Sequence, residues 1–80
     1  MNVIIANKQR REQDNEKINI AINQVIERQR KIDRKEFVFL IMQMLNLSRR
    51  TAQDSIDSIM SVRKLEFREQ TIKEKQYGLE

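Results

Sequence analysis

The sequence predicts a small, mainly α-helical domain in which three helices are followed by a small C-terminal β-hairpin. Three observations support this fold class. The chain has 80 residues, which is enough for one hydrophobic core but not for two. It has no proline and a single glycine, Gly78, so few residues interrupt a helix. Apolar side chains recur at helical spacing in three segments, and a short alternating segment follows the last of them.

The composition excludes several classes of protein. Without cysteine or histidine the chain cannot form disulfides, thiolate or imidazole metal sites, or histidine-based acid–base catalysts. No carboxylate pair stands beside a nucleophile, so we expect neither an enzyme nor a bound metal or cofactor. The longest apolar run, Phe37 to Met42, is far shorter than the roughly 20 residues that span a bilayer, and no signal pattern is present. We therefore expect a cytoplasmic protein without a membrane segment.

The N-terminal segment 1–13 is expected to form an arm rather than part of the core. It contains the apolar residues Val3, Ile4 and Ile5, but the residues from 8 to 17 are almost all polar and show no helical apolar stripe. We expect this arm to be disordered in the free protein. Alternatively, its apolar residues form a short strand or an anchor on a protein partner.

The first helix is expected over 14–31. Its apolar face consists of residues three and four positions apart, namely Ile18, Ala21, Ile22, Val25 and Ile26. Cations near its C-terminal end are favoured by the helix dipole. We place the folded domain at 14–78, because Leu79 and Glu80 match the residues that a common cloning junction leaves behind.

The second helix is expected over 34–45. Asp33 and Glu36 have the capping-box spacing, in which each side chain accepts a hydrogen bond from the other residue's backbone N–H. One face gathers the apolar residues Phe37, Leu40, Ile41, Met44 and Leu45. Phe39 falls near the opposite face. Either a second layer such as the arm or the first helix covers it, or it belongs to a subunit interface.

A tight turn is expected to join the second helix to a third helix over 48–62. Asn46 suits the left-handed conformation that ends a helix, and Ser48 is a strong N-cap two residues later. The inward positions of the third helix are Ala52, Ile56, Ile59 and Met60. Arg49 and Arg50 follow the cap, so the outer N-terminal half of this helix is basic.

The segment after the third helix is expected to form a β-hairpin with neither glycine nor proline at its tip. Leu65 and Phe67 alternate with polar residues, as in a strand with one buried face, and the chain returns through 71–73. The competing interpretation is a continuing helix, because Val62, Leu65 and Ile72 also share one helical face. We favour the hairpin.

The run from Ile32 to Phe67 resembles the core of winged helix-turn-helix DNA-binding proteins. It contains a capped helix, a leucine-containing turn, a Ser-Arg-Arg-Thr start to a recognition helix, and a basic-then-apolar exit into a wing. Here these parts are 33–45, Asn46-Leu47, 48–51 and 62–67. The resemblance covers about half of the chain. It implies a helix-turn-helix core with a hairpin wing and a transcriptional regulator that binds double-stranded DNA.

The third helix also points to a mode of DNA binding on physical grounds. Its N-terminal turn can enter the major groove, where we expect Arg50 and Gln53 to contact base edges. Hydroxyl groups and free backbone donors at its start would hold phosphates. The expected DNA-binding residues are Ser48, Arg49, Arg50, Thr51 and Gln53 on this helix, and Arg63, Lys64, Arg68 and Lys73 on the exit and the wing.

Acidic residues on the same helix set limits on this interpretation. Arg50 and Asp54 are four residues apart, so an exposed ion pair worth about 0.3–0.5 kcal/mol would account for Arg50 without DNA. Asp54 and Asp57 lie on the outer face and would repel phosphates. Only the first turn and a half of the helix can therefore insert.

Three functional interpretations follow. The first is a double-stranded DNA-binding regulator or architectural protein, favoured by the net charge of +4 and expected to be a homodimer because its core is thin. The second is a protein-binding accessory subunit of a DNA-processing complex, anchored by the arm or by Phe39. The third is a ribbon-helix-helix dimer. It fits worse, because Met1 to Asn7 lacks the alternating polar contacts of a DNA-reading ribbon.

Overall fold

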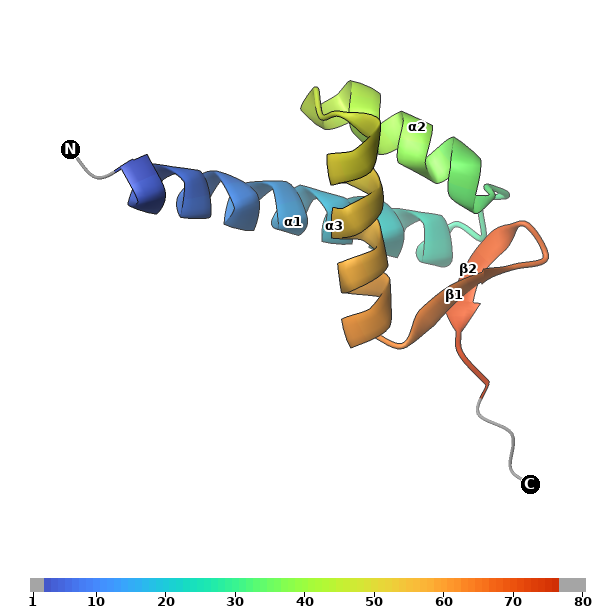
Figure 1. The fold of residues 1–80 in the computed structure, drawn as a ribbon. Helices are drawn as coiled ribbons and strands as arrows, with labels where there is room; N and C mark the ends of the chain where they lie inside the picture. Colours follow the sequence, from blue (N-terminus) through green and yellow to red (C-terminus); the bar gives the residue numbers. More distant parts are fainter. Residues whose placement is uncertain (1–2, 77–80) are drawn as a thin grey trace.

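Three α-helices are followed by one antiparallel β-hairpin (Figure 1). The computed structural model describes the backbone of residues 3–76 and the side chains of residues 12–76. The elements are α1 (Val3–Glu27), α2 (Arg34–Leu45), α3 (Arg49–Val62), β1 (Leu65–Arg68) and β2 (Thr71–Glu74). This order confirms the expected three-helix core with a C-terminal hairpin and rules out the continuing helix. Leu79 and Glu80, interpreted as a cloning remnant, lie outside the described residues.

α1 begins earlier than the sequence analysis predicted. It starts at Val3 rather than at residue 14, so most of the expected arm is helical instead of disordered or extended. The polar stretch is rich in Lys, Arg, Gln and Glu, which are strong helix formers and readily extend a helix that packing has already nucleated. Apolar residues at helical spacing begin only at Ile18, so the periodicity indicated only the C-terminal part of α1. In Figure 1 the N-terminal half runs beyond the other elements, so the segment projects as a helical arm.

α1 also ends earlier than predicted, at Glu27 rather than at residue 31. Gln29 adopts a left-handed conformation with φ 49°. Its N–H donates to the carbonyl of Ile26 at 3.2 Å, and the N–H of Arg30 donates to the carbonyl of Val25 at 3.0 Å. These two bonds form a Schellman motif, which satisfies the last carbonyls of a helix and stops it. The basic residues expected in the last turn therefore lie in the connection to α2.

Local caps set the boundaries of α2 and α3 as the sequence predicted. Asp33 Oδ1 accepts from the Glu36 N–H at 2.8 Å, and Glu36 Oε1 accepts from the Asp33 N–H at 3.4 Å. Asn46 ends α2 in a left-handed conformation with φ 55° and ψ 48°. Ser48 Oγ then accepts from the Thr51 N–H at 3.2 Å and starts α3. The two helices are thus joined by a turn of only three residues, 46–48.

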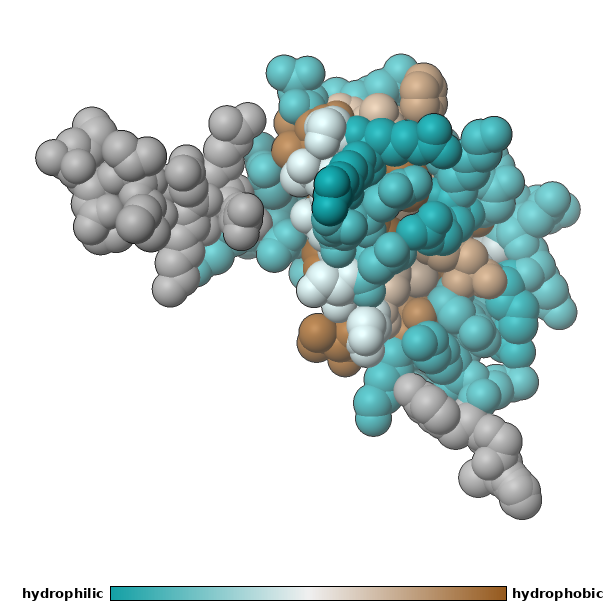
Figure 2. Space-filling view, viewed as in Figure 1, coloured by the Kyte–Doolittle hydropathy of each residue, from teal (hydrophilic) through white to brown (hydrophobic). Residues whose placement is uncertain are grey.

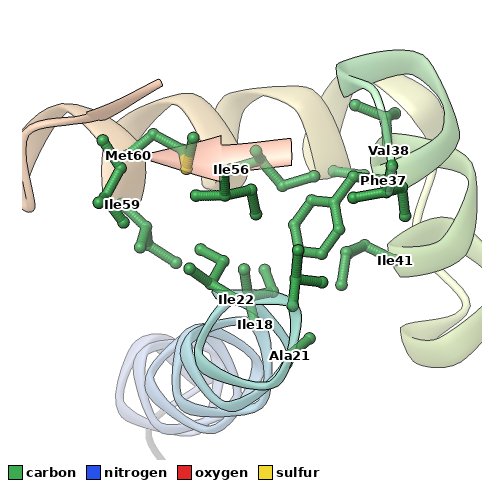
Figure 3. Close-up of a cluster of buried hydrophobic side chains, with 14 residues drawn as sticks. Ile18, Ala21, Ile22, Phe37, Val38, Ile41, Ile56, Ile59 and Met60 are labelled. Carbon is green, nitrogen blue, oxygen red and sulfur yellow. The ribbon is translucent and has the colours of Figure 1, made fainter. Parts of the chain in front are cut away.

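The hydrophobic core lies where the three helices cross and the hairpin covers them. Phe37 is fully buried, and Figure 3 shows its ring between side chains of α1 and α3. The buried face of α2 differs from the predicted one. Val38 is buried, whereas Met44, which was expected on that face, is 47% exposed. The buried side chains of α2 lie in its first eight residues, and Met42 and Leu45 nearer its C-terminal end are only partly buried against the core. The core residues are Ile18, Ala21, Ile22, Val25, Ile32, Phe37, Val38, Ile41, Ala52, Ile56, Ile59, Met60, Leu65 and Ile72.

The hairpin is attached to the helical core along one face and at its tip. Phe67 pairs with Ile72 across the two strands, and the Phe67 ring lies 5.9 Å from that of Phe37, centroid to centroid. Because successive side chains of a strand point to opposite faces, Glu66, Arg68 and Lys73 lie on the outer face of the hairpin. At the tip the carbonyl of Gln70 accepts from the Ile32 N–H at 2.6 Å. The wing of this protein is therefore held against the connection between α1 and α2.

Candidate nucleic-acid interface

The N-terminal turn of α3 is organised around one hydroxyl pair. Ser48 Oγ accepts from the Thr51 backbone N–H and donates to Thr51 Oγ1 at 2.9 Å. The Ser48 hydroxyl is therefore engaged in capping the helix. Thr51 is exposed, and its own hydroxyl proton is still available to donate. Of the two hydroxyls expected to hold phosphates, Thr51 is the better placed.

Two arginines follow this cap on the surface. Arg49 and Arg50 are both exposed, and neither enters an ion pair with another described residue. In particular, the Arg50–Asp54 pair that the spacing allowed is not formed. Figure 2 shows that the surface over α3 is mostly hydrophilic, with hydrophobic side chains at its edges. The first turn of α3 thus presents two guanidinium groups to solvent.

An ion pair from α2 offsets one of the acidic residues of α3. The guanidinium of Arg34 contacts both carboxylate oxygens of Asp57, with Nη2 at 2.7 Å from Oδ2 and 2.9 Å from Oδ1, and with Nε at 3.3 Å from Oδ1. Asp57 was expected to repel phosphates, and Arg34 now compensates its charge. The sequence carried no signal for this pair, because the two residues are 23 positions apart in different helices. Asp54 has no ion-pair partner among the described residues.

The N-terminus of α2 brings further cations beside α3. Arg34 and Lys35 line the same surface groove as Arg49 and Gln53. Both α2 residues are exposed. Neither residue is among the DNA-binding residues expected from the sequence, although the sequence carried one signal for them. Two cations in the first turn of a helix oppose its dipole and call for another explanation.

Arg63 lies apart from this group. Its guanidinium donates to Asn19 Oδ1 at 2.9 Å and to Asn23 Oδ1 at 2.7 Å, both on α1. The 14 residues of α3 separate Arg63 from Arg49, a distance of about 20 Å at 1.5 Å per residue. Arg63 thus links the C-terminal end of α3 to the second half of α1. Its expected contact with DNA stays a prediction.

The remaining expected residues lie on or near the hairpin. Arg68 and Lys73 share its outer face with Glu66, and Arg68 Nε lies 3.8 Å from a Glu66 carboxylate oxygen. Lys73 donates to Glu69, and this hydrogen bond together with the charge of Lys73 lowers the pKa of Glu69 below its ordinary value of 4.5. Lys64 occupies the turn before β1 with φ 55°. The hairpin cations are thus separated from the start of α3 and partly compensated by acids.

Neither a metal-ion cluster nor a membrane-spanning helix is found in the described part of the chain. No group of three or more acidic residues comes together in a way that could hold a metal ion among residues 12–76. No helix in the described range is long and apolar enough to cross a membrane. Comparison of the chain with protein-family models, curated proteins and solved structures finds no match. The functional interpretation therefore rests on the geometry of the start of α3 and of the N-terminus of α2 alone.

Proposed function

We propose that the protein binds double-stranded DNA as a small regulator or architectural protein, with the N-terminal half of α3 in the major groove. One observation carries this proposal. Arg49 and Arg50 lie exposed at the start of α3 without an ion pair in the described structure, while Arg34 compensates Asp57 on the same helix. A surface helix with only structural duties gains nothing from two unpaired cations at its positive dipole end.

The groups on α3 and α2 match the two kinds of contact that DNA requires. Arg50 can offer paired donors to guanine, and Gln53 can pair with adenine, at base edges in a groove about 12 Å wide. In a helix-turn-helix the first of the two helices crosses the DNA backbone. Lys35 and Arg34 on α2 are suited to that position, and Arg34 retains the two Nη1 donors that Asp57 does not use.

Acidic side chains limit how deeply α3 can insert. Asp54 lies one turn beyond Arg50 and has no described ion-pair partner. Its charge opposes approach of the C-terminal part of α3 to phosphates. A single copy therefore reads a short site. We propose that two copies bind together, with their α3 helices about 34–36 Å apart as in other dimers that read successive major grooves.

Binding to a fluorescein-labelled duplex, followed by anisotropy over a series of salt concentrations, tests this function. The logarithm of the binding constant should fall with log salt by about 0.9 per phosphate contacted. Binding that does not change with salt, or no binding at about 50 mM salt by a folded sample, contradicts the proposal.

Three variants separate sequence reading from general attraction. Arg50→Ala should lose the preference for a site selected from a random duplex library, by about 1–3 kcal/mol. Lys35→Ala should weaken binding to every duplex alike and reduce the salt slope by about 1. Lys75→Ala is the matched control, because it removes the same charge at the base of the hairpin, where its N–H donates to the Lys64 carbonyl. An Arg50→Ala protein that keeps its site preference would refute the role of α3.

A further inference from the structure

A groove with an apolar floor runs between α2 and the start of α3. Its volume is about 560 Å³, and Val38, Phe39 and Met42 form its apolar part. Phe39 is 58% exposed, so no second layer covers it in the described structure. The polar residues around the groove are Arg34, Lys35, Glu36, Arg49 and Gln53. A large exposed aromatic side chain beside a hollow of this size is typical of a binding surface rather than of an isolated surface residue.

We infer that this groove binds an acidic amphipathic helix from a partner protein, and that such a helix excludes DNA from α3. The docking stands independently, whereas the exclusion of DNA rests on the function proposed above. Helix-in-groove recognition uses apolar anchors three or four residues apart, and Phe39 and Met42 are themselves three apart on α2. An incoming helix can therefore lay its apolar face along α2.

The charges around the groove specify the acidic character of the partner. Three cations and one carboxylate line it. Arg34 is paired with Asp57, and the Glu36 carboxylate accepts the Asp33 N–H in the cap of α2. Lys35 and Arg49 thus provide the charge that an incoming helix meets, one from each wall. Complementary acids flanking the apolar anchors would steer the partner into the groove and fix its orientation.

The same charges disfavour a second copy of this chain as the occupant. In a two-fold symmetric contact each patch meets an identical patch. Lys35 and Arg49 would then face the same cations of the other copy around the exposed Phe39. Repulsion of like charges opposes that contact.

Single-stranded nucleic acid fits the groove less well than an acidic helix. Bases bind by stacking on successive aromatic side chains. Phe39 is the one aromatic residue among those lining the groove, and its neighbours Val38 and Met42 are aliphatic. The shape and lining favour aliphatic and aromatic side chains of a peptide over a row of bases.

Occupation of the groove and binding of DNA use overlapping residues. Arg49 and Gln53 line the groove and also belong to the proposed DNA-reading turn. A bound acidic helix would place carboxylates beside them. Phosphates and the acidic helix therefore compete for the same cations, and the partner would act as a release factor for DNA.

A synthetic peptide provides the probe for docking. It is a fluorescein-labelled helical 16-residue peptide with leucines at positions i, i+4 and i+7 and glutamates on both flanks of that stripe. One control peptide replaces the glutamates with glutamine, and another scatters the leucines around the helix. Phe39→Ser should weaken binding of the glutamate peptide by at least about tenfold, the loss typical of a central apolar anchor. Met44→Ser is the matched variant, since Met44 is an exposed apolar residue of α2 outside the groove lining and should leave affinity unchanged.

A charge exchange tests the proposed complementarity. Lys35→Glu should weaken binding of the glutamate peptide and strengthen binding of a version with lysine flanks. Amide chemical shifts should move at Val38 and Met42 when peptide is added. Equal binding of the glutamine peptide, insensitivity to Phe39→Ser, or Phe39-dependent binding of a single-stranded oligonucleotide instead of the peptide would each overturn the proposal.

Competition with duplex DNA completes the test. Unlabelled glutamate peptide should release labelled duplex at concentrations near its own dissociation constant. Simultaneous binding of peptide and duplex would overturn the release mechanism but leave docking intact. If the peptide binds at Phe39 while no duplex binds at all, the proposed DNA function fails and the groove proposal stands.

Discussion

Arg34 at the first position of α2 forms an ion pair with Asp57 in the third turn of α3, and its guanidinium contacts both oxygens of the carboxylate. Both side chains are about half exposed, at 47% and 55%. Solvent therefore screens the pair, and its contribution to stability is modest. Its larger effect is electrostatic, because it compensates a negative charge on the face of α3 that is proposed to approach DNA.

A double-mutant cycle should detect the Arg34–Asp57 pair and show no coupling for Arg50–Asp54. We expect a coupling free energy of about 0.5–1 kcal/mol between Arg34 and Asp57, at the upper end for exposed pairs because the geometry is bidentate. Replacing Arg50 and Asp54 should give additive effects, since these two side chains are not paired. Urea unfolding of the single variants Arg34→Gln and Asp57→Asn and of the double variant measures the first coupling. Equal coupling in both cycles would contradict the structure.

The caps at both ends of α2 and at the start of α3 were predictable from neighbouring residues, whereas the left-handed Gln29 that ends α1 was not. Asp33, Asn46 and Ser48 were assigned as caps from their types and spacing, and all three cap helices in the structure. The alternation of Leu65 and Phe67 likewise predicted the hairpin. The predicted start of α1 was wrong, because its N-terminal residues are mostly polar and show no apolar period from which a helix could be predicted.

The parts of the candidate site that could not be predicted depend on contacts between residues far apart in the sequence. Asp57 is compensated by a residue 23 positions away, and Arg63 bonds Asn19 and Asn23, which are 44 and 40 positions away. A charge pattern along one helix cannot reveal either contact. The placement of Lys35 and Arg49 around one groove depends in the same way on how α2 crosses α3.

Arg63 should contribute to stability rather than to DNA binding. Arg63→Ala removes the two hydrogen bonds to Asn19 and Asn23, and because the site is partly exposed we expect a loss of about 1 kcal/mol in the free energy of unfolding. Affinity of the folded protein for duplex DNA should stay within about twofold, which corresponds to less than 0.5 kcal/mol. Chemical denaturation and anisotropy measure the two quantities. Unchanged stability with a large loss of DNA affinity would return Arg63 to the interface.

The Glu69–Lys73 pair predicts a pH dependence of the hairpin. The hydrogen bond from Lys73 and its charge lower the pKa of Glu69 below its ordinary value of 4.5. A carboxyl group whose pKa is lower in the folded state stabilises that state above the unfolded pKa, and the stabilisation is lost as the pH falls through the folded pKa. Tip amides near Glu69 should therefore lose hydrogen-exchange protection in acid. The Glu69→Gln protein should lack this component of the pH dependence, and an identical profile in both proteins would contradict it.

The tip of the hairpin should become more stable when glycine replaces Gln70. Glu69 and Gln70 have φ values of 57° and 60°, both in the left-handed region, as a type I′ turn requires. A side chain at such a position crowds the backbone, and asparagine followed by glycine is the usual solution. Glu69 is better left in place because it pairs with Lys73. Gln70→Gly keeps the carbonyl that accepts the Ile32 N–H and should raise the free energy of unfolding by about 0.5–1 kcal/mol.

The same substitution within a helix provides the control for Gln70→Gly. Gln24 is exposed in α1 and has no left-handed backbone, so Gln24→Gly should lower the free energy of unfolding by up to about 1 kcal/mol. The two variants have the same composition, and any effect of glycine on the unfolded chain is common to both. Urea denaturation should therefore shift the two midpoints in opposite directions. A Gln70→Gly protein that is destabilised as much as Gln24→Gly would show that residue 70 is not left-handed, and the tip would need a different turn.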